Sequence, residues 1–441
     1  MKRLLSLLLC AVLALFCATT AQAAGVSITL TASEYALHYA FDAGAQDPFV
    51  ILEYATPAEK GWMMLYSEDG HFEGDVSIAY SGAGGKTSVA LTSARTTGSI
   101  GKASTTLPKA ADYQKPTGKS NAKVMDFVLT ETPEGFHYAF NAAGTDYMLL
   151  YWRSKEQTVT QPVYPDENGH YEGDIISELT FARTQFTVQV KSGSGSMKKE
   201  ATVRKGYQAP EAPQRQEGRL SGVTVCIDAG HQENGRFVNE PIGPGLSGST
   251  SGKGGMAQGT KTNRRESIVC LEIGMLLRDE LLRQGANVIM TREDQTTFHT
   301  NIERCEIAEA GGAQIMLRLH CNNSSNHSKR GIQVYGPLNS DYAKAVADAD
   351  TYREMGQKLL DAMKTRVGMT LANSTGMVRL NDNYVGNNWA KMMCFLVEMG
   401  YLSNPAEEYL LVTPVYQQWL AEGMADGVYE IAVARGWVQA Q

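Results

Sequence analysis

Four side chains that could bind a metal ion or move a proton lie next to predicted strands and helices. His231 comes shortly after a buried strand, His320 directly follows a second strand and Glu398 a third. Glu266 stands immediately before a predicted helix. Because the carboxyl ends of strands in an α/β sheet meet at one rim, the sequence predicts that two imidazoles and two carboxylates gather there.

This set of groups fits the hydrolysis of an amide. Two histidines and one carboxylate, with a fourth position open for water, are typical of a catalytic zinc site. Zinc acidifies its water and polarises a carbonyl, and a second carboxylate can pass the proton to a leaving amine. Taken alone, a histidine after a strand is more often a structural or loop residue than a ligand. Glu266 alone is an acid that a helix dipole favours at its N-terminus.

The elements that must position these groups follow from the pattern beyond residue 220. Strand-like apolar runs alternate there with helical patterns, which predicts an α/β domain. The predicted strands cover residues 223–227, 287–291, 313–319, 332–335 and 393–397. The predicted helices cover residues 267–283, 302–310, 352–367 and 416–435.

Several motifs in this half resemble those of one known family. Ile227–His231 (IDAGH) is similar to the strand–Asp–Pro–Gly–His opening of the zinc-dependent N-acetylmuramoyl-L-alanine amidases with an AmiC-like catalytic domain. Ala229 replaces the usual proline, and Gln232 replaces the usual glycine. The resemblance covers residues 220–436, about half of the chain. Further blocks agree with the family in order and approximate spacing: Glu266 before a leucine-rich helix, Thr291-Arg292, Asn301 with Arg304, Leu319–Asn322 and Leu396–Asn404.

The resemblance implies a role for each of the four residues. His231, Glu266 and His320 would hold one Zn²⁺, and Glu398 would act as general base and acid. The bond cleaved would be the amide between N-acetylmuramic acid and the L-alanine of the stem peptide. The implied fold is a mixed sheet flanked by helices. Two other functions stay open: a zinc peptidase acting on cell-wall peptides, and a non-catalytic wall-binding protein.

Four more residues are candidates for substrate contacts. Arg318 shares a strand face with His320 and could meet a carboxylate of the stem peptide, and Asn322 follows closely. Asn388 and Trp389 precede the strand of Glu398 and could hydrogen-bond to and stack on the sugar–peptide junction. Trp389 could equally belong to the core.

The stretch 232–265 between two predicted ligands is long and rich in glycine and serine. Its Glu240–Gly245 segment (EPIGPG) resembles a loop found in a subgroup of the same family. We expect it to border the cleft as a substrate-gripping or lid loop; the alternative is a tolerated surface insertion. Structural ion pairs are a sufficient explanation for Arg292 and Arg304.

The N-terminal half contains an internal repeat with an offset of 99 residues. Leu37–Asp42 (LHYAFD) matches Phe136–Asn141 (FHYAFN), and Gly70–Val76 (GHFEGDV) matches Gly169–Ile175 (GHYEGDI). Short alternating runs separated by turn clusters predict two tandem all-β sandwich-like repeats. Each repeat keeps two histidines, which are either structural or part of a ligand-binding surface, for example for wall glycan.

The first residues predict export. Lys2 and Arg3 precede an apolar core, and Ala21–Ala23 is a small-residue cleavage site. No later segment is apolar enough to cross a bilayer. The net charge is -7, whereas proteins that bind nucleic acids usually carry an excess of positive charge. The composition therefore does not indicate a nucleic-acid partner.

Five cysteines remain after cleavage, and their spacing predicts buried thiols rather than a disulfide framework. They are Cys226, Cys270, Cys305, Cys321 and Cys394. We expect a secreted, cell-wall-associated monomer acting on peptidoglycan. The predicted domain plan is a signal peptide (1–23), two repeats (24–115 and 122–205), a linker (206–219) and a catalytic domain (220–441).

Overall fold

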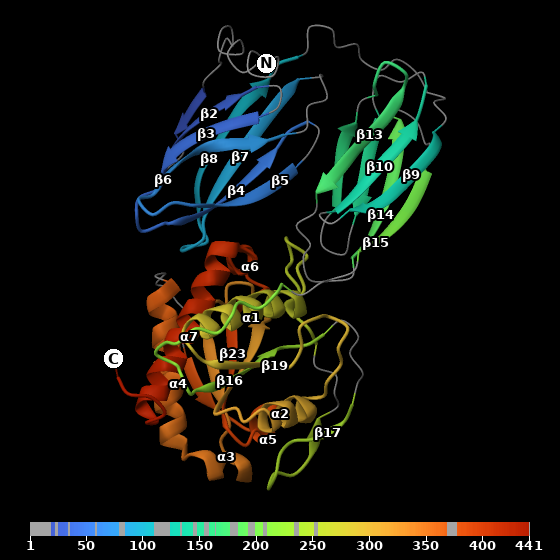
Figure 1. Ribbon diagram of the computed structural model, residues 1–441. Helices are drawn as coiled ribbons and strands as arrows, with labels where there is room; N and C mark the ends of the chain where they lie inside the picture. Colours follow the sequence, from blue (N-terminus) through green and yellow to red (C-terminus); the bar gives the residue numbers. More distant parts are fainter. Residues whose placement is uncertain are drawn as a thin grey trace. The chain divides into compact units, whose positions relative to one another are not determined.

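Figure 1 shows the computed structural model of the chain. It divides into two compact units whose boundary lies close to Arg204 and Lys205. The structure describes residues 19–440 except 23–24, 34–35, 58–59, 79–83, 110–123, 133–134, 144–147, 154–157, 164, 177–183, 193–198, 206–209, 233–237, 251–254 and 368–376. The apolar core of the predicted signal peptide lies outside the described residues. Within them, no helix is long and apolar enough to span a membrane.

The N-terminal unit begins with two four-stranded antiparallel sheets, ordered β1-β2-β3-β6 and β5-β4-β7-β8. The strands are β1 (Thr19–Gln22), β2 (Ser27–Ala32), β3 (Ala36–Asp42), β4 (Phe49–Ala55), β5 (Lys60–Tyr66), β6 (His71–Ser77), β7 (Gly85–Ser93) and β8 (Ser99–Leu107). Leu30 and Phe41 from the first sheet pack in one buried core with Leu52 and Leu91 from the second. Alternate residues of each strand therefore face a shared interior, as in a sandwich.

β1 lies inside the segment predicted as signal peptide. It pairs with β2 at the edge of the first sheet, Thr19 opposite Leu30. Cleavage after Ala23 would remove β1 and leave β2 as the edge strand.

The N-terminal unit continues with a three-stranded sheet, β13-β10-β9, and a four-stranded sheet, β12-β11-β14-β15. These strands are β9 (Met125–Thr132), β10 (Gly135–Asn141), β11 (Met148–Arg153), β12 (Thr158–Val163), β13 (His170–Ile176), β14 (Thr184–Ser192) and β15 (Lys199–Lys205). The pairing of β10 with β13 has the register of β3 with β6. His137 lies opposite Asp174 as His38 lies opposite Asp75.

The recurring histidines lie on partly exposed strand faces and not in the cores. The Nδ1 of His38 is 3.1 Å from Asp75 Oδ1, and the Nδ1 of His137 is 2.9 Å from Asp174 Oδ1. The neighbouring inward residue of each strand is a buried tyrosine, Tyr39 in the first case. Successive residues of a strand point to opposite faces. The recurring tyrosine therefore packs in the core, and the neighbouring histidine lies at the surface.

The C-terminal unit is built on a six-stranded sheet of order β19-β16-β20-β23-β21-β22. Its strands are β16 (Thr224–Ala229), β19 (Asn287–Met290), β20 (Ile315–Asn322), β21 (Gln333–Gly336), β22 (Met377–Leu380) and β23 (Met393–Tyr401). All neighbours are parallel except β21 and β23, which are antiparallel. The sheet is therefore mixed, and a short two-stranded ribbon, β17 (Glu240–Pro241) with β18 (Ser249–Thr250), accompanies it.

Helices cover both faces of this sheet. They are α1 (Glu266–Arg283), α2 (Asn301–Ala310), α3 (Asp341–Val346), α4 (Ala349–Val367), α5 (Val385–Trp389), α6 (Pro405–Leu411) and α7 (Pro414–Ala434). Figure 1 shows α1 and α2 on opposite sides of β16, β19 and β23. Gly274 of α1 faces Ile227 and Leu319, whereas Cys305 of α2 packs with Cys226 and Cys394. Odd-numbered residues of β16 and β20 thus face α1, and even-numbered ones face α2.

The predicted elements of this half are confirmed, with shifted ends. The predicted strands 313–319 and 393–397 run further, so that His320 and Glu398 are residues of β20 and β23 and do not follow them. Glu266 is the first residue of α1. The sequence patterns did not predict β22, α3, α5 or α6, which are all short.

Candidate active site

His231, Glu266 and His320 converge at the carboxyl end of the sheet. One potential ligand atom from each lies within 4.8 Å of the others. Glu266 Oε1 is 3.1 Å from His231 Nε2 and 2.9 Å from His320 Nδ1, and the two imidazole centroids are 4.9 Å apart. Two imidazoles and one carboxylate in this arrangement could hold a metal ion.

Backbone donors fix the buried carboxylate of Glu266. The N–H of Ala257 donates to Oε2 at 2.7 Å, and the N–H of Cys321 donates to Oε1 at 3.1 Å. Burial opposes ionisation of Glu266, but its hydrogen bonds with the two histidines outweigh burial and hold its pKa well below the usual range.

Different features prepare the two histidines for their role: the protonation state of His320 and the backbone conformation of His231. Burial lowers the pKa of His320, which favours the neutral imidazole that a metal ligand requires. His231 has a φ of 58°, in the left-handed region that residues other than glycine seldom adopt. Such backbone strain is found at functional sites where the surrounding structure enforces it.

Glu398 lies one strand away from this group. In the register of β20 and β23 it is the direct partner of His320, so both side chains share a sheet face. Its Oε2 is buried and has no hydrogen-bond partner among the described residues. Burial and the charge of Glu266 raise the pKa of Glu398 to about 8. Two neighbouring glutamates therefore have opposite pKa shifts, as in sites that separate a fixed charge from a proton carrier.

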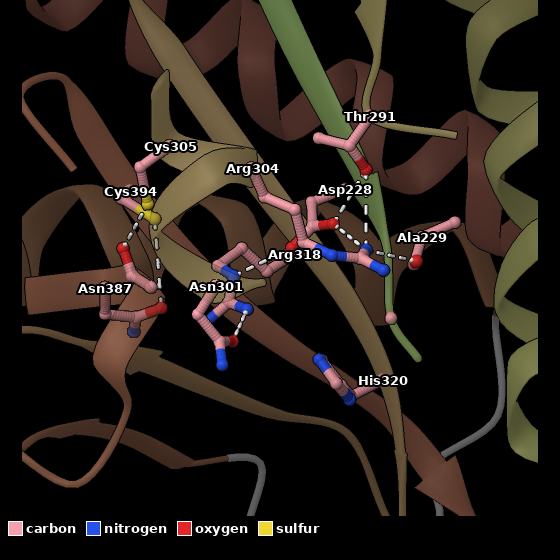
Figure 2. A network of polar contacts seen from close by, with 12 residues as sticks. Asp228, Ala229, Thr291, Asn301, Arg304, Cys305, Arg318, His320, Asn387 and Cys394 are labelled. Carbon is pink, nitrogen blue, oxygen red and sulfur yellow. Dashed lines mark hydrogen bonds and ion pairs between the residues drawn. The ribbon is translucent and has the colours of Figure 1, made fainter. Parts of the chain in front are cut away.

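A buried ion network lies next to the site (Figure 2). Asp228 of β16 is fully buried and lies between Arg304 and Arg318. The Nε of Arg318 donates to Asp228 Oδ2 at 2.9 Å, and Thr291 Oγ1 donates to Oδ1 at 2.8 Å. Arg304 also donates to the carbonyl of His231 at 3.1 Å, so the network reaches the backbone of a candidate ligand.

The hydrogen bonds of the arginines that the sequence placed near the rim show what each of them binds in the structure. Arg318 lines the cleft, but its guanidinium binds Asp228 and Asn301 Oδ1, the latter at 2.7 Å. Arg318 thus makes structural contacts at the cleft, and its contact with a substrate carboxylate stays a prediction. Arg292 donates to the carbonyls of Ala229, at 2.7 Å, and Gly230, at 2.9 Å, so its role is structural but runs through backbone carbonyls, whereas Arg304 forms the expected ion pair.

The cleft above these groups has a volume of about 730 Å³. The described part of the 232–265 loop contributes Val238, Glu240, Thr250, Met256 and Ala257 to its lining. Residues 233–237 and 251–254 of this loop lie outside the described residues. The loop borders the cleft, as predicted.

Glu240 ties this loop to α2. Its carboxylate accepts from the backbone N–H of Asn301 at 3.2 Å and of Ile302 at 2.8 Å. These are unpaired donors of the first helical turn, where an acidic side chain is stabilised.

Two of the predicted substrate residues hold the same loop instead. Asn388 is buried and donates to the carbonyl of Ile242 at 3.1 Å, and Trp389 Nε1 donates to that of Pro241 at 2.9 Å. Neither lines the cleft. Asn322 does line it, and its side chain donates to Gln333 Oε1 at 3.1 Å.

Sequence reasoning missed further residues of the cleft wall, among them Phe298, Asn383 and Tyr384. They lie outside the long strands and helices, apart from the motifs that carry the resemblance. No periodicity or strand-end signal in the sequence indicates them.

Two histidines and a carboxylate at one cleft, with a second carboxylate nearby, are typical of metal-assisted hydrolases. Residues 225–430 match the family N-acetylmuramoyl-L-alanine amidase. These residues therefore form an N-acetylmuramoyl-L-alanine amidase domain, and all of them lie in the C-terminal unit.

Curated relatives agree with this assignment. A germination-specific N-acetylmuramoyl-L-alanine amidase of Bacillus subtilis is 26% identical over 231 residues, which is 49% of this chain and 83% of the relative. LytH of Staphylococcus aureus, described as a probable cell wall amidase, is 27% identical over 218 residues, 48% of this chain and 60% of the relative.

Solved structures with similarity include an amidase from Clostridium difficile 630, with 24% identity and a TM-score of 0.39, covering 49% of this chain and all of the other. Ami1 of Mycobacterium smegmatis has 17% identity and a TM-score of 0.43, and covers 49% of this chain and 99% of the other.

Proposed function

We propose that the chain is a secreted, zinc-dependent peptidoglycan hydrolase. It cleaves the amide between N-acetylmuramic acid and the L-alanine of the stem peptide. The convergence of His231, Glu266, His320 and Glu398 at one cleft is the observation that carries this proposal.

The donor set fits zinc. Glu266 Oε1 lies 3.1 Å from His231 Nε2 and 2.9 Å from His320 Nδ1, so two imidazole nitrogens and one carboxylate oxygen, all of them zinc-binding atoms, converge on one point. His231, Glu266 and His320 would hold the ion, giving the two-histidine, one-carboxylate set of many zinc hydrolases. A zinc ion held there would acidify a water molecule and polarise the carbonyl of the scissile amide.

Glu398 carries the proton. As the carboxylate it accepts a proton from the attacking water, and as the acid it donates this proton to the nitrogen of the leaving L-alanine. Its buried position and raised pKa suit a group that must exist in both forms during turnover.

The surrounding residues position substrate and exclude water. Asn322 lines the cleft and is available at its floor for a hydrogen bond to the peptide. The 232–265 loop acts as a wall that grips the substrate, anchored by Glu240, Asn388 and Trp389. Closing a site in this way strengthens the electrostatic interactions inside it.

The two N-terminal modules are tandem copies that serve as accessories for wall attachment. The shared register of the His38–Asp75 and His137–Asp174 pairs supports a common origin. The domain plan of signal peptide (1–23), repeats (24–115 and 122–205), linker (206–219) and catalytic domain (220–441) is part of this proposal, as is a monomeric state.

Digestion of purified peptidoglycan followed by mass analysis tests the function. We expect intact stem peptides that begin with L-alanine, and glycan strands with free muramic acid. Glu398→Gln should release them at least about 100-fold more slowly, whereas Glu354→Gln, an exposed glutamate of α4, should match the wild type. Peptides cut internally would show a peptidase, and a rate in Glu398→Gln close to that of the wild type would contradict the assigned proton carrier.

A further inference from the structure

A second hollow of about 460 Å³ adjoins the catalytic cleft. The two share Asn322 and Asn323 in their linings. The second hollow is lined by Asn322, Asn323, Ser328, Lys329, Arg330, Gln333, Tyr335, Arg379 and Tyr401. The proposed reaction does not use it.

Positive charge dominates this hollow. Lys329, Arg330 and Arg379 all line it, and no aspartate or glutamate is among its described lining residues. The whole chain has a net charge of -7. A cluster of three cationic side chains therefore has the opposite sign to the net charge of the protein. A concave site with one sign of charge attracts ligands of the opposite sign.

The buried carboxyl group of Glu407, on α6, lies next to this hollow, because it accepts from the backbone N–H of the lining residue Tyr401 at 2.8 Å. The positive charge of Arg330 acts on Glu407, but burial prevails and raises the pKa of Glu407 to about 7. Glu407 is therefore only partly ionised near neutral pH and offsets only part of the positive charge of the hollow.

Strand register relates the hollow to the catalytic centre. On β21, Gln333 is the partner of Glu398, and Tyr335 is the partner of Arg379 on β22. Paired residues share a sheet face, and neighbouring strands are about 4.8 Å apart. Arg379 therefore lies on the face of Glu398, two strands (about 10 Å) to the side and two residues (about 7 Å) along the strand.

A polar floor connects the two hollows. Gln333 Oε1 accepts hydrogen bonds from Asn322 Nδ2 at 3.1 Å and from Tyr335 Oη at 2.6 Å. Tyr335 also packs against Tyr384, which lines the catalytic cleft, with ring centroids 5.1 Å apart. The floor is therefore continuous and hydrogen-bonded.

We infer that this hollow is a subsite for a carboxylate of the stem peptide on the leaving side of the scissile amide. The inference rests on the proposed function. A peptide in extended form covers about 10 Å in three residues, so the carboxylate belongs to one of the first three residues after the cut. Arginine and lysine around a carboxylate provide charge-assisted hydrogen bonds. The subsite takes the role that the sequence suggested for Arg318.

Three soluble muramoyl peptides of one sequence test this subsite. The first keeps a free carboxylate within the first three residues, the second carries a carboxamide there, and the third is amidated only at its C-terminus. Each partly exposed ion pair is worth about 1 kcal/mol, so KM should differ at least about fivefold between a carboxylate and the carboxamide substrate. The wild type should therefore show a lower KM for the first and third substrates than for the second, with equal kcat.

The variants sharpen this comparison. Arg379→Gln and Lys329→Gln should each raise KM about fivefold for the carboxylate substrates and leave the carboxamide substrate unchanged. Arg353→Gln removes an exposed arginine of α4 that lines neither hollow and should change nothing. A KM ratio between substrates that is unaltered by Arg379→Gln and Lys329→Gln would overturn the subsite.

A binding measurement separates this inference from the proposed function. The peptide product with a free carboxylate is titrated into Glu398→Gln and into the double variant Glu398→Gln/Arg379→Gln by calorimetry. Weaker binding to the double variant for the carboxylate peptide alone supports the subsite, and equal binding overturns it. Failure of the wild type to cleave any substrate would refute the proposed function, and the titration would still decide the subsite.

Discussion

Glu266 and Glu398 are two buried glutamates of one cleft whose pKa values move apart. Hydrogen bonds with two histidines keep Glu266 ionised, whereas burial and the charge of Glu266 raise the pKa of Glu398 to about 8. A residue that stays ionised suits a metal ligand, and one with a pKa near neutrality suits proton transfer. Their different environments thus favour different roles for them in the proposed reaction.

Substitution of either kind of residue should produce a different defect. Glu398→Gln should lower kcat by about 10²–10⁴-fold, the usual contribution of a general acid–base, and leave the zinc content unchanged. His320→Ala should lower both activity and zinc content. Metal analysis and turnover on the same samples check this, and zinc loss in Glu398→Gln would contradict the assignment.

The raised pKa of Glu398 also predicts proton release on metal binding. Without metal, a carboxyl with a pKa of about 8 is mostly protonated at pH 7. A nearby cation lowers the pKa of a carboxyl, so zinc binding should expel this proton. The wild type should release up to one proton more than Glu398→Gln at pH 7, and the difference should vanish above pH 9. Calorimetry in two buffers of different ionisation heat measures it; equal release at pH 7 would contradict the raised pKa.

At the scale of elements, the Asp228 network joins β16, β20 and α2 next to the site. Arg304 and Arg318 are both buried and both bind Asp228. Breaking a buried ion pair by removing one partner leaves an uncompensated charge, which costs about 3–5 kcal/mol.

Asp228→Ala should therefore lower the free energy of unfolding of the C-terminal unit by about 3–5 kcal/mol. Asp350→Ala removes an aspartate whose side chain is 94% exposed and should change stability by less than about 0.5 kcal/mol. Denaturant unfolding of the full chain compares the two. Equal stability of both variants would show that the network is not needed for folding.

The sequence predicted the elements better than the contacts between them. Apolar periodicity located β16, β20, β23, α1 and α7, because burial imposes that pattern locally. The strand ends of His320 and Glu398 were placed too early, because these polar residues extend their strands through pairing with neighbours. Asn388 and Trp389 were given to the substrate because their partners, the carbonyls of Ile242 and Pro241, are about 150 residues earlier in the chain, beyond what local patterns report.

At the scale of the whole molecule, the candidate active site and the N-terminal sheets belong to different units. The cleft residues all lie in the C-terminal unit. A fragment of residues 205–441 should therefore cleave a soluble muramoyl peptide with a kcat/KM within about twofold of the full chain, since compact domains fold independently. On insoluble cell walls we expect the same fragment to be slower. A loss of soluble activity would show that the N-terminal unit contributes to the site.

The zinc content of the purified full chain tests the central claim most directly. After reconstitution and removal of excess metal, mass spectrometry of the native protein should find one zinc ion per chain. The double variant His231→Ala/His320→Ala should bind none, while His38→Ala/His137→Ala should keep the ion. A wild type that binds no zinc, or a His231→Ala/His320→Ala variant that keeps it, would contradict the three-ligand site.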